Sequence, residues 1–510
     1  MSTVDVHGLV LGAGGRYGGA AMKLPDALMD SAAFPDRPAD IELHETHISW
    51  VFVAGGNAYK VKKPVAFPFL DYSTPERRRM FCHAELRLNR RFAPAIYRDV
   101  VGLVPRGPAG LAVAGEHDPR AVEYAVAMRR YDEASTLAAR LPTLSEDDAR
   151  AVGAAIARWH ADAPRGTGQP LAEVVDETLT TLGEAAGAVP ALARFFHAAL
   201  TGFAADLAAR PAVDGHGDLR AEHILLGDRI QAVDGLEFDP GLRIADPGYD
   251  LAFLLMDVSR ADDALAQAIL DGYRAAGGDP GSDALLACFC ALRALVRAKV
   301  DLLRAAQLDG DAAAERAERG RGLLALAERY AWRARLPRVV AVTGLPASGK
   351  STVAGALAAA TGRPVLSSDV IRKQRAGLDP RDRAPADAYS DEESRAVYAE
   401  LAREAHAHGA IVDATFRRPA DAAAFLEHAP ETAWLVCEAP PDVLLERART
   451  RTGSASDAGE AFVARELAAH PGPFRAPGPE LARLDTTPPV PEILAGLAAA
   501  LDARLGTLDT

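Results

Sequence analysis

The chain has 510 residues, more than one hydrophobic core accommodates, so two or three domains are expected. Hydrophobic residues make up 49% of it and charged residues 25%, a balance that is typical of globular proteins and excludes an intrinsically disordered chain. The formal net charge is −13 and no run of Lys and Arg resembles a nucleic-acid-binding patch, which argues against a nucleic acid as the partner.

The first stretch, residues 1–40, is predicted to be a leader that is partly disordered. It contains several glycines between Gly12 and Gly19, but no helix-forming segment follows them, so a dinucleotide-binding loop is not expected. It also lacks the basic start of a signal peptide, and the chain contains no apolar run of about 18 residues. The four cysteines are too scattered for a disulfide framework, so we expect a cytoplasmic protein without a membrane partner.

The segment after residue 40 has the pattern of β-strands. Residues 47–53 and 58–63 are predicted to form a hairpin around a glycine-containing turn. Thr74 followed by Pro75 is typical of a helix start, and this helix would carry Glu85. Further elements are predicted by period and composition, with strands near 100–104 and 122–128 and helices over 144–209 and 251–330.

Two short motifs in the following segment carry chemistry. The string His216-Gly-Asp218 is followed, after a predicted hairpin, by apolar residues and Asp234, an order that matches a kinase catalytic loop and its metal-binding aspartate. This pattern resembles the aminoglycoside-phosphotransferase-like, or protein-kinase-like, family over roughly residues 41–325. The other residues that carry the resemblance are Lys60, Lys62, Glu85 and Asp250.

The resemblance implies a site for ATP and Mg²⁺ in this part of the chain. It assigns Asp218 as the base that accepts the proton of an acceptor hydroxyl and Asp234 as a metal ligand. Lys60 or Lys62 would contact the phosphates and be held by Glu85. Both lysines point to the same side of a strand, so the pattern leaves the choice between them open.

The chain departs from this family five residues after Asp218. The family has a metal-binding Asn there, whereas this chain has His223, whose neutral imidazole is a poor ligand for Mg²⁺. His223 stays a candidate metal ligand, and the carboxylates that could substitute are Glu222, Glu237 and Asp239. Both an active site and a pseudokinase, a kinase-like domain that does not transfer phosphate, fit this pattern.

The most specific motif follows a predicted buried strand at residues 339–343. A G-x-x-x-x-G-K-S loop and then a helix come after this strand, which is the context of a phosphate-binding P-loop. The glycines let backbone N–H groups surround an anion, Lys350 can reach the β- and γ-phosphates of ATP, and Ser351 can ligate Mg²⁺. The predicted phosphate-binding residues are Gly344, Leu345, Pro346, Ala347, Ser348, Gly349, Lys350, Ser351 and Thr352.

Charged residues further on are predicted to complete the P-loop site. Asp369 and Arg372 follow a short strand, where Asp369 can accept the proton of an attacking hydroxyl and Arg372 can hold an anionic group. A plain helix N-cap is the alternative role of Asp369. Asp413 ends a buried strand and is a candidate ligand of Mg²⁺ or its water. Arg447 and Arg451 would belong to a lid over the triphosphate, or else to a solvated helix end.

Residues from 337 to about 500 resemble the P-loop kinases of small molecules and polynucleotides, a group with gluconate-kinase-like, zeta-toxin-like and 5′-hydroxyl kinase domains. The order of the two parts is similar to a bacterial family that fuses a phosphotransferase-like domain to a P-loop kinase domain, often labelled AAA-family ATPase. The expected fold class is therefore α/β and α+β. A two-lobed kinase-like domain is expected over residues 41–332, followed by a P-loop domain with a parallel sheet over 337–510.

We expect an ATP-dependent phosphotransferase that transfers the γ-phosphate to a hydroxyl of a small polar molecule, with ATP and Mg²⁺ as cofactors. The P-loop site is expected to be active, and the activity of the N-terminal site stays open. The alternatives are a regulatory ATPase with a pseudokinase domain, a 5′-hydroxyl polynucleotide kinase and a zeta-toxin-like kinase.

Overall fold

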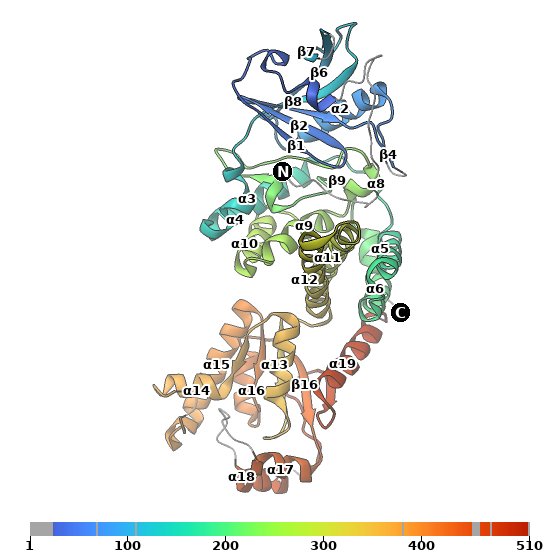
Figure 1. Cartoon of the computed structure of the whole chain (residues 1–510). Helices are drawn as coiled ribbons and strands as arrows, with labels where there is room; N and C mark the ends of the chain where they lie inside the picture. Colours follow the sequence, from blue (N-terminus) through green and yellow to red (C-terminus); the bar gives the residue numbers. More distant parts are fainter. Residues whose placement is uncertain are drawn as a thin grey trace. The chain divides into compact units, whose positions relative to one another are not determined.

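The computed structural model describes residues 24–67, 70–107, 110–379, 382–450, 459–469 and 472–507. This described chain forms two compact units (Figure 1). Unit 1 lies within Met1–Val189, Asp206–Ser282 and Phe289–Leu326, and unit 2 lies within Pro190–Ala205, Asp283–Cys288 and Ala327–Thr510. None of the helices in the described ranges is long and apolar enough to cross a membrane.

An antiparallel sheet opens unit 1, with six strands in the residues that the structure describes. In sheet order these are β1 (Ile41–Glu45), β2 (Ser49–Ala54), β3 (Asn57–Lys62), β8 (Glu123–Arg129), β6 (Tyr97–Arg106) and β7 (Gly110–Gly115). The predicted hairpin is confirmed as β2 and β3, in which Lys60 pairs with Val51. Helix α2 (Pro75–Asn89) contacts β6 and β8, and the Thr74 hydroxyl caps it by accepting from the Arg77 amide, as its sequence predicts.

Residues 24–40, the described part of the predicted leader, are folded against the sheet of unit 1. Helix α1 (Leu24–Ala27) and the 3₁₀ turn η1 (Ser31–Ala33) place apolar side chains against the sheet. Removing these side chains from water favours an ordered segment here. The buried residues of this cluster include Leu24, Leu28, Phe34, Trp50, Phe52 and Tyr59. The glycine-rich segment Gly12–Gly19 lies outside the described residues.

Helices form most of the remainder of unit 1 (Figure 1). The longer ones are α4 (Glu146–Ala161), α5 (Leu171–Ala186), α9 (Pro247–Ser259), α10 (Asp263–Ala275), α11 (Asp283–Ala305) and α12 (Gly310–Arg335), the last two with residues in both units. Short helices are α3 (Leu137–Arg140), α8 (Pro240–Arg243) and α7 (Ala204–Ala209), the last of which also has residues in both units. Short strands pair as β4 (Ala66–Phe67) with β5 (Leu70–Asp71), β9 (Val213–Asp214) with β12 (Ile244–Ala245), and β10 (Ile224–Leu225) with β11 (Gln231–Ala232).

Unit 2 contains a parallel sheet, with five strands in its described part. Their order is β14 (Val365–Ser367), β15 (Ala410–Asp413), β13 (Val339–Thr343), β16 (Ala433–Glu438) and β17 (Glu480–Asp485). The P-loop strand β13 is therefore central, and all of its residues are buried. In open parallel sheets of this kind, the crevice at the carboxyl ends of the strands is where ligands bind.

Helices cover both faces of this sheet. Successive residues of β13 point to opposite faces, so the strand contributes apolar side chains to a separate cluster on each face. On one side, α13 (Lys350–Thr361) and α19 (Val490–Leu505) share an apolar cluster with Val340 and Val342. On the other, α15 (Asp391–His408) and α16 (Pro419–Leu426) share a cluster with Val339 and Ala341. The remaining helices of unit 2 after the P-loop are α14 (Ser368–Arg375), α17 (Pro441–Thr450) and α18 (Glu460–Ala469).

Unit 2 also contains α6 (Pro190–Gly202), which precedes the P-loop by more than a hundred residues. This helix contacts α19 so closely that a Cβ atom at Gly202 would lie 2.1 Å from the carbonyl oxygen of Leu505. Asp502 of α19 is buried and accepts hydrogen bonds from Nε of Arg194, at 3.0 Å, and from Nε of Arg335, at 2.6 Å. The folded unit thus includes segments that precede the predicted domain of residues 337–510.

Candidate functional site

The P-loop has the backbone geometry of an anion cradle. Gly344 and Gly349 have φ values of 143° and 83°, a region that side chains rarely allow. A Cβ atom at Gly344 would also lie 2.3 Å from the carbonyl oxygen of Cys437. Gly349 is the N-cap of α13, and no side chain of the described residues caps this helix. Its first N–H groups therefore stay available to a phosphate.

The polar side chains of the loop are arranged around this cradle. Lys350 is buried and its Nζ donates a 2.9 Å hydrogen bond to the carbonyl oxygen of Leu345, so it lies over the loop. Ser348 is also buried, and its Oγ has no hydrogen-bond partner among the described residues. Ser351 and Thr352, in the first turn of α13, are exposed. The role of Ser351 as a ligand of Mg²⁺ stays a prediction.

Two predicted carboxylates lie at the same edge of the sheet as the P-loop. Asp413 ends β15 and is in register with Val342 of β13 and Ser367 of β14. Asp369 is the second residue of α14, directly after β14, and both carboxylates are partly exposed. The N-cap of α14 is Ser367, so the alternative role of Asp369 as the N-cap is wrong. The role of Asp369 as the base in proton transfer stays a prediction.

Arg372 lies deeper than its predicted substrate role requires. It is buried, and its Nη1 donates to the carbonyl oxygen of Ala388, at 2.6 Å, and to Oγ of Ser394, at 3.1 Å. Its Cζ lies 4.7 Å from the ring centroid of Tyr389. These contacts hold the segment before α15 in place. Its Nε is buried without a partner among the described residues, and contact with an anionic acceptor stays a prediction.

Arg447 is connected to the P-loop through a residue that sequence reasoning missed. Its Nη1 donates to Oγ1 of Thr486, at 3.0 Å, and its Nη2 to the carbonyl oxygen of Thr486, at 2.6 Å. The Thr486 hydroxyl donates in turn to the carbonyl oxygen of Ser348, at 2.9 Å. Arg447 is therefore not simply a solvated helix end. Its predicted companion Arg451 lies outside the described residues.

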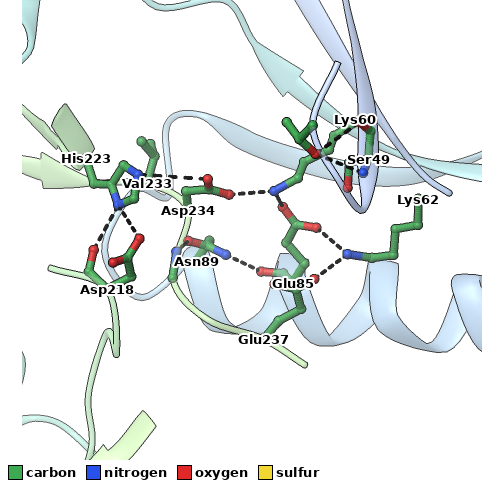
Figure 2. A network of polar contacts seen from close by, with 12 residues as sticks. Ser49, Lys60, Lys62, Glu85, Asn89, Asp218, His223, Val233, Asp234 and Glu237 are labelled. Atoms are coloured by element: carbon green, nitrogen blue, oxygen red, sulfur yellow. Dashed lines mark hydrogen bonds and ion pairs between the residues drawn. The ribbon is translucent and has the colours of Figure 1, made fainter. Parts of the chain in front are cut away.

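In unit 1, β3 and α2 bring together the predicted lysine, glutamate and aspartate (Figure 2). Nζ of Lys60 lies 2.5 Å from Oδ1 of Asp234 and 2.8 Å from Oε1 of Glu85. Burial lowers the pKa of Lys60, but Asp234 and Glu85 outweigh it and hold the pKa well above its usual value. Lys60 is therefore the lysine that faces the candidate metal ligand Asp234.

Lys62 occupies a different place, on the far side of Glu85 from Asp234 (Figure 2). Its Nζ lies 2.8 Å from Oε2 of Glu85 and forms a further ion pair with Glu237. The hydroxyl of Tyr72 donates to Oε1 of Glu237 at 2.8 Å. Lys62 is fully buried among these partners, so the choice that the sequence left open falls on Lys60 as the lysine beside the site.

Asp218 is completely buried and paired with an arginine that sequence reasoning did not single out. Nε of Arg220 lies 2.9 Å from one carboxylate oxygen of Asp218, and Nη2 lies 3.0 Å from the other. Burial raises the pKa of Asp218, but Arg220 and His223 outweigh burial and lower it below its ordinary value. Asp218 is thus a weak base while this pair persists. The sequence places Arg220 only two residues after Asp218, and this spacing could have indicated the ion pair.

Asp250 fixes the backbone of this loop. Its carboxylate accepts hydrogen bonds from the amides of His216, at 2.8 Å, and Gly217, at 2.9 Å. Nε2 of His160 lies 3.2 Å from the same carboxylate. Gly217 has a φ of 82°, which allows the sharp turn that precedes Asp218.

The three carboxylates considered as substitute metal ligands in unit 1 have other partners. Glu222 forms an ion pair with Arg220, Glu237 pairs with Lys62, and Asp239 accepts a 2.8 Å hydrogen bond from the amide of Gly241 at the start of α8. Among the described residues, no group of three or more His, Cys, Asp or Glu side chains is arranged to hold a metal ion.

Comparison with known proteins covers both units. Residues 339–473 match a protein family described as AAA domain. Two mycobacterial relatives, Uncharacterized protein Rv2004c of Mycobacterium tuberculosis and Uncharacterized protein Mb2027c of Mycobacterium bovis, are each 33% identical to this chain over 482 residues. The match spans 87% of this chain and 92% of each relative.

Solved structures also resemble parts of the chain. A choline/ethanolamine kinase family protein from Mesorhizobium loti is 18% identical, with 60% of this chain and 97% of that chain covered and a TM-score of 0.38. A gluconokinase from Sinorhizobium meliloti 1021 is 26% identical, with 34% and 95% covered and a TM-score of 0.25. The predicted parallel sheet of the P-loop unit is confirmed, and residues 339–473 of this unit match the AAA domain family.

Proposed function

We propose that this chain, which belongs to the same family as Rv2004c of Mycobacterium tuberculosis, is an ATP-dependent kinase that phosphorylates a hydroxyl group of a small polar molecule. Transfer takes place at the P-loop of unit 2. The observation that carries this proposal is the common edge of the sheet on which the P-loop, Asp369 and Asp413 lie.

In this mechanism the chain acts mainly by positioning. The free amides of α13 and the ammonium of Lys350 hold the β- and γ-phosphates, for which the glycine conformations of the loop leave room. Ser351 and Asp413 are the candidate holders of Mg²⁺, which supplies positive charge to the phosphates when bound. Asp369 accepts the proton of the acceptor hydroxyl as it attacks the γ-phosphate.

Arg447 supports the phosphate side of the site. Its two hydrogen bonds to Thr486 place its guanidinium next to the loop that holds Ser348. A positive charge fixed in this way stabilises the charge that develops on the transferred phosphoryl group. The net charge of −13 and the lack of a basic run favour a small acceptor over a polynucleotide.

A second candidate is a regulatory nucleotide-binding protein in which unit 1 is a pseudokinase. It is favoured by the pairing of Asp218 with Arg220 and by His223 at the place of a metal-binding Asn. In that case, ATP turnover at the P-loop would need no acceptor.

One experiment distinguishes the kinase from the regulatory nucleotide-binding protein. The purified full chain is incubated with Mg-ATP and a metabolite extract, and mass spectrometry records species that gain a phosphate. Variants Lys350→Ala, Asp369→Asn and Asp218→Asn run in parallel, with Glu427→Gln, an exposed carboxylate ahead of β16, as the matched control. The kinase proposal expects a phosphorylated product that disappears with Lys350→Ala and Asp369→Asn but persists with Asp218→Asn and Glu427→Gln. ADP formation without any phosphorylated acceptor would instead support the regulatory protein.

A further inference from the structure

His223 in unit 1 has both ring nitrogens engaged by other groups. Nδ1 donates a 2.8 Å hydrogen bond to the carbonyl oxygen of Asp218, which leaves Nε2 as the acceptor atom of the neutral ring (Figure 2). Nη2 of Arg220 lies 3.2 Å from this Nε2 and donates to it. The imidazole that replaces the metal-binding Asn therefore already binds a cation, which is a side chain of the protein.

Arg220 is held in this position from several sides. Its Nε and Nη2 bind the two carboxylate oxygens of Asp218, and its Nη1 pairs with Glu222. The side chain is buried, so its charge is poorly screened by water. A divalent ion bound to Nε2 of His223 would lie directly beside this fixed positive charge. The donor set in unit 1 therefore does not fit a divalent metal ion at His223.

Lys60 places a second buried cation near His223, next to Asp234. Lys60 neutralises Oδ1 of Asp234, and Oδ2 of Asp234 lies 4.0 Å from Nε2 of His223. Arg297 of α11 lies close enough to Asp218 to lower its pKa, and the pKa of Arg297 is itself lowered by burial and by the neighbouring Arg220. Asp218, Asp301 and Asp257 act on Arg297 in the opposite direction and raise its pKa.

We infer that unit 1 binds a nucleoside triphosphate in its metal-free form, with the guanidinium of Arg220 in the place where a divalent ion would act. Lys60, which pairs with Asp234, supplies a further positive charge for the phosphate groups. This site differs from the P-loop site, at which Mg²⁺ is expected, and the inference goes beyond the proposed function of unit 2.

The test measures ATP binding by isothermal titration calorimetry on the full chain that carries Lys350→Ala, which weakens the P-loop site. The inference expects binding in EDTA with a dissociation constant within about twofold of that in Mg²⁺, because no phosphate contact depends on the metal. Lys60→Met in the same background should abolish the signal and so assign it to unit 1. Arg220→Gln should weaken binding in EDTA by about tenfold or more, as expected for a lost charge-assisted contact.

Two further variants separate the role of Arg220 from a general loss of structure. Arg220→Lys keeps a positive charge and should retain most of the binding in EDTA. Arg316→Gln is the matched control, since it removes an arginine of unit 1 that shares Asp301 with Arg319, and it should leave binding unchanged. Thermal melting shows whether each variant is folded.

Three results would overturn the inference. ATP binding in the Lys350→Ala background that requires Mg²⁺ would show that unit 1 holds a metal after all. Binding in EDTA that Arg220→Gln leaves intact would exclude Arg220 as the replacing cation. A folded Lys350→Ala chain that binds no ATP under either condition would exclude a nucleotide site in unit 1, whatever the outcome of the phosphorylation experiment on unit 2.

Discussion

The ammonium of Lys60 lies 2.5 Å from Oδ1 of Asp234, whereas Lys62 on the same strand is fully buried against Glu237 and Glu85. The two lysines therefore differ in their partners although they share one face of β3. Lys60 lies between Glu85 and the candidate metal ligand Asp234, and Lys62 lies between Glu85 and Glu237.

Replacing Lys62 should mainly affect stability. Lys62→Met leaves Glu237 and Glu85 with one cation fewer in a buried place, so we expect the free energy of unfolding to fall by about 3 kcal/mol. Urea unfolding followed by circular dichroism measures this change. The double variant Lys62→Met with Glu237→Gln should recover part of the loss, and a double variant as unstable as the single one would contradict this explanation.

The stability of unit 1 should depend on pH through His216. Burial, with a smaller effect of His223, lowers the pKa of His216 from 6.5 to about 4. Because the pKa of His216 is lowered on folding, the neutral side chain contributes fully to the free energy of unfolding above pH 6.5. This contribution is lost as the pH falls toward about 4, since the unfolded chain then binds a proton that the folded protein does not. Between neutral pH and about pH 5 this loss amounts to about 2 kcal/mol.

His216→Gln tests this prediction because glutamine cannot gain the proton. Urea unfolding of the wild type and the variant at neutral pH and at about pH 5 gives the two changes in stability. We expect the variant to lose less stability on acidification. Equal losses in both proteins would show that His216 does not titrate as the buried environment implies.

Thr486 should contribute to nucleotide binding at the P-loop, although no part of the P-loop motif contains it. Thr486→Val removes the hydroxyl that joins Arg447 to the carbonyl oxygen of Ser348, and we expect ATP affinity to fall by about fivefold to tenfold. Thr487→Val is the matched control, since the hydroxyl of Thr487 binds Asp485. Calorimetry with Mg-ATP compares the two, and equal affinities would contradict this role.

Asp502 should contribute to the stability of unit 2, because its buried carboxylate binds both Arg194 and Arg335. Asp502→Ala leaves the guanidinium groups of Arg194 and Arg335 without their buried carboxylate, so we expect a loss of about 3 kcal/mol in the stability of unit 2. Glu492→Gln, an exposed residue of the same helix, is the control. A melting temperature that is equal in both variants would show that the α6–α19 contact contributes little.

Much of the fold follows from local patterns in the sequence. The P-loop strand, glycine turn and helix lie within about twenty consecutive residues, so their spacing alone predicts them. The β2–β3 hairpin and the start of α2 at Thr74 and Pro75 follow in the same way from turn and capping residues. The resemblance of the His216–Asp218 string to kinase catalytic loops also predicted that Asp234, further along the chain, is a metal ligand.

The remaining features depend on contacts between distant segments, which periodicity does not encode. The preference for Lys60 over Lys62 follows from the position of Asp234 and Glu237 in three dimensions. The link from Arg447 to Thr486, and the pairing of Asp502 with Arg194, join residues far apart in the chain. The ordered segment from Leu24 to Phe34 is short and has no repeating pattern, so only its packing on the sheet identifies it.

The central claim is that the P-loop unit transfers phosphate with Asp369 as the base. The most direct measurement is the rate at which the γ-phosphate of labelled ATP appears in the acceptor identified from the extract, for Asp369→Asn and for Glu427→Gln. The account predicts that Asp369→Asn slows transfer by about a hundredfold or more while ATP affinity stays unchanged, and that Glu427→Gln has no effect. Full transfer by Asp369→Asn, together with its loss in Asp218→Asn, would contradict the account and move the chemistry to unit 1.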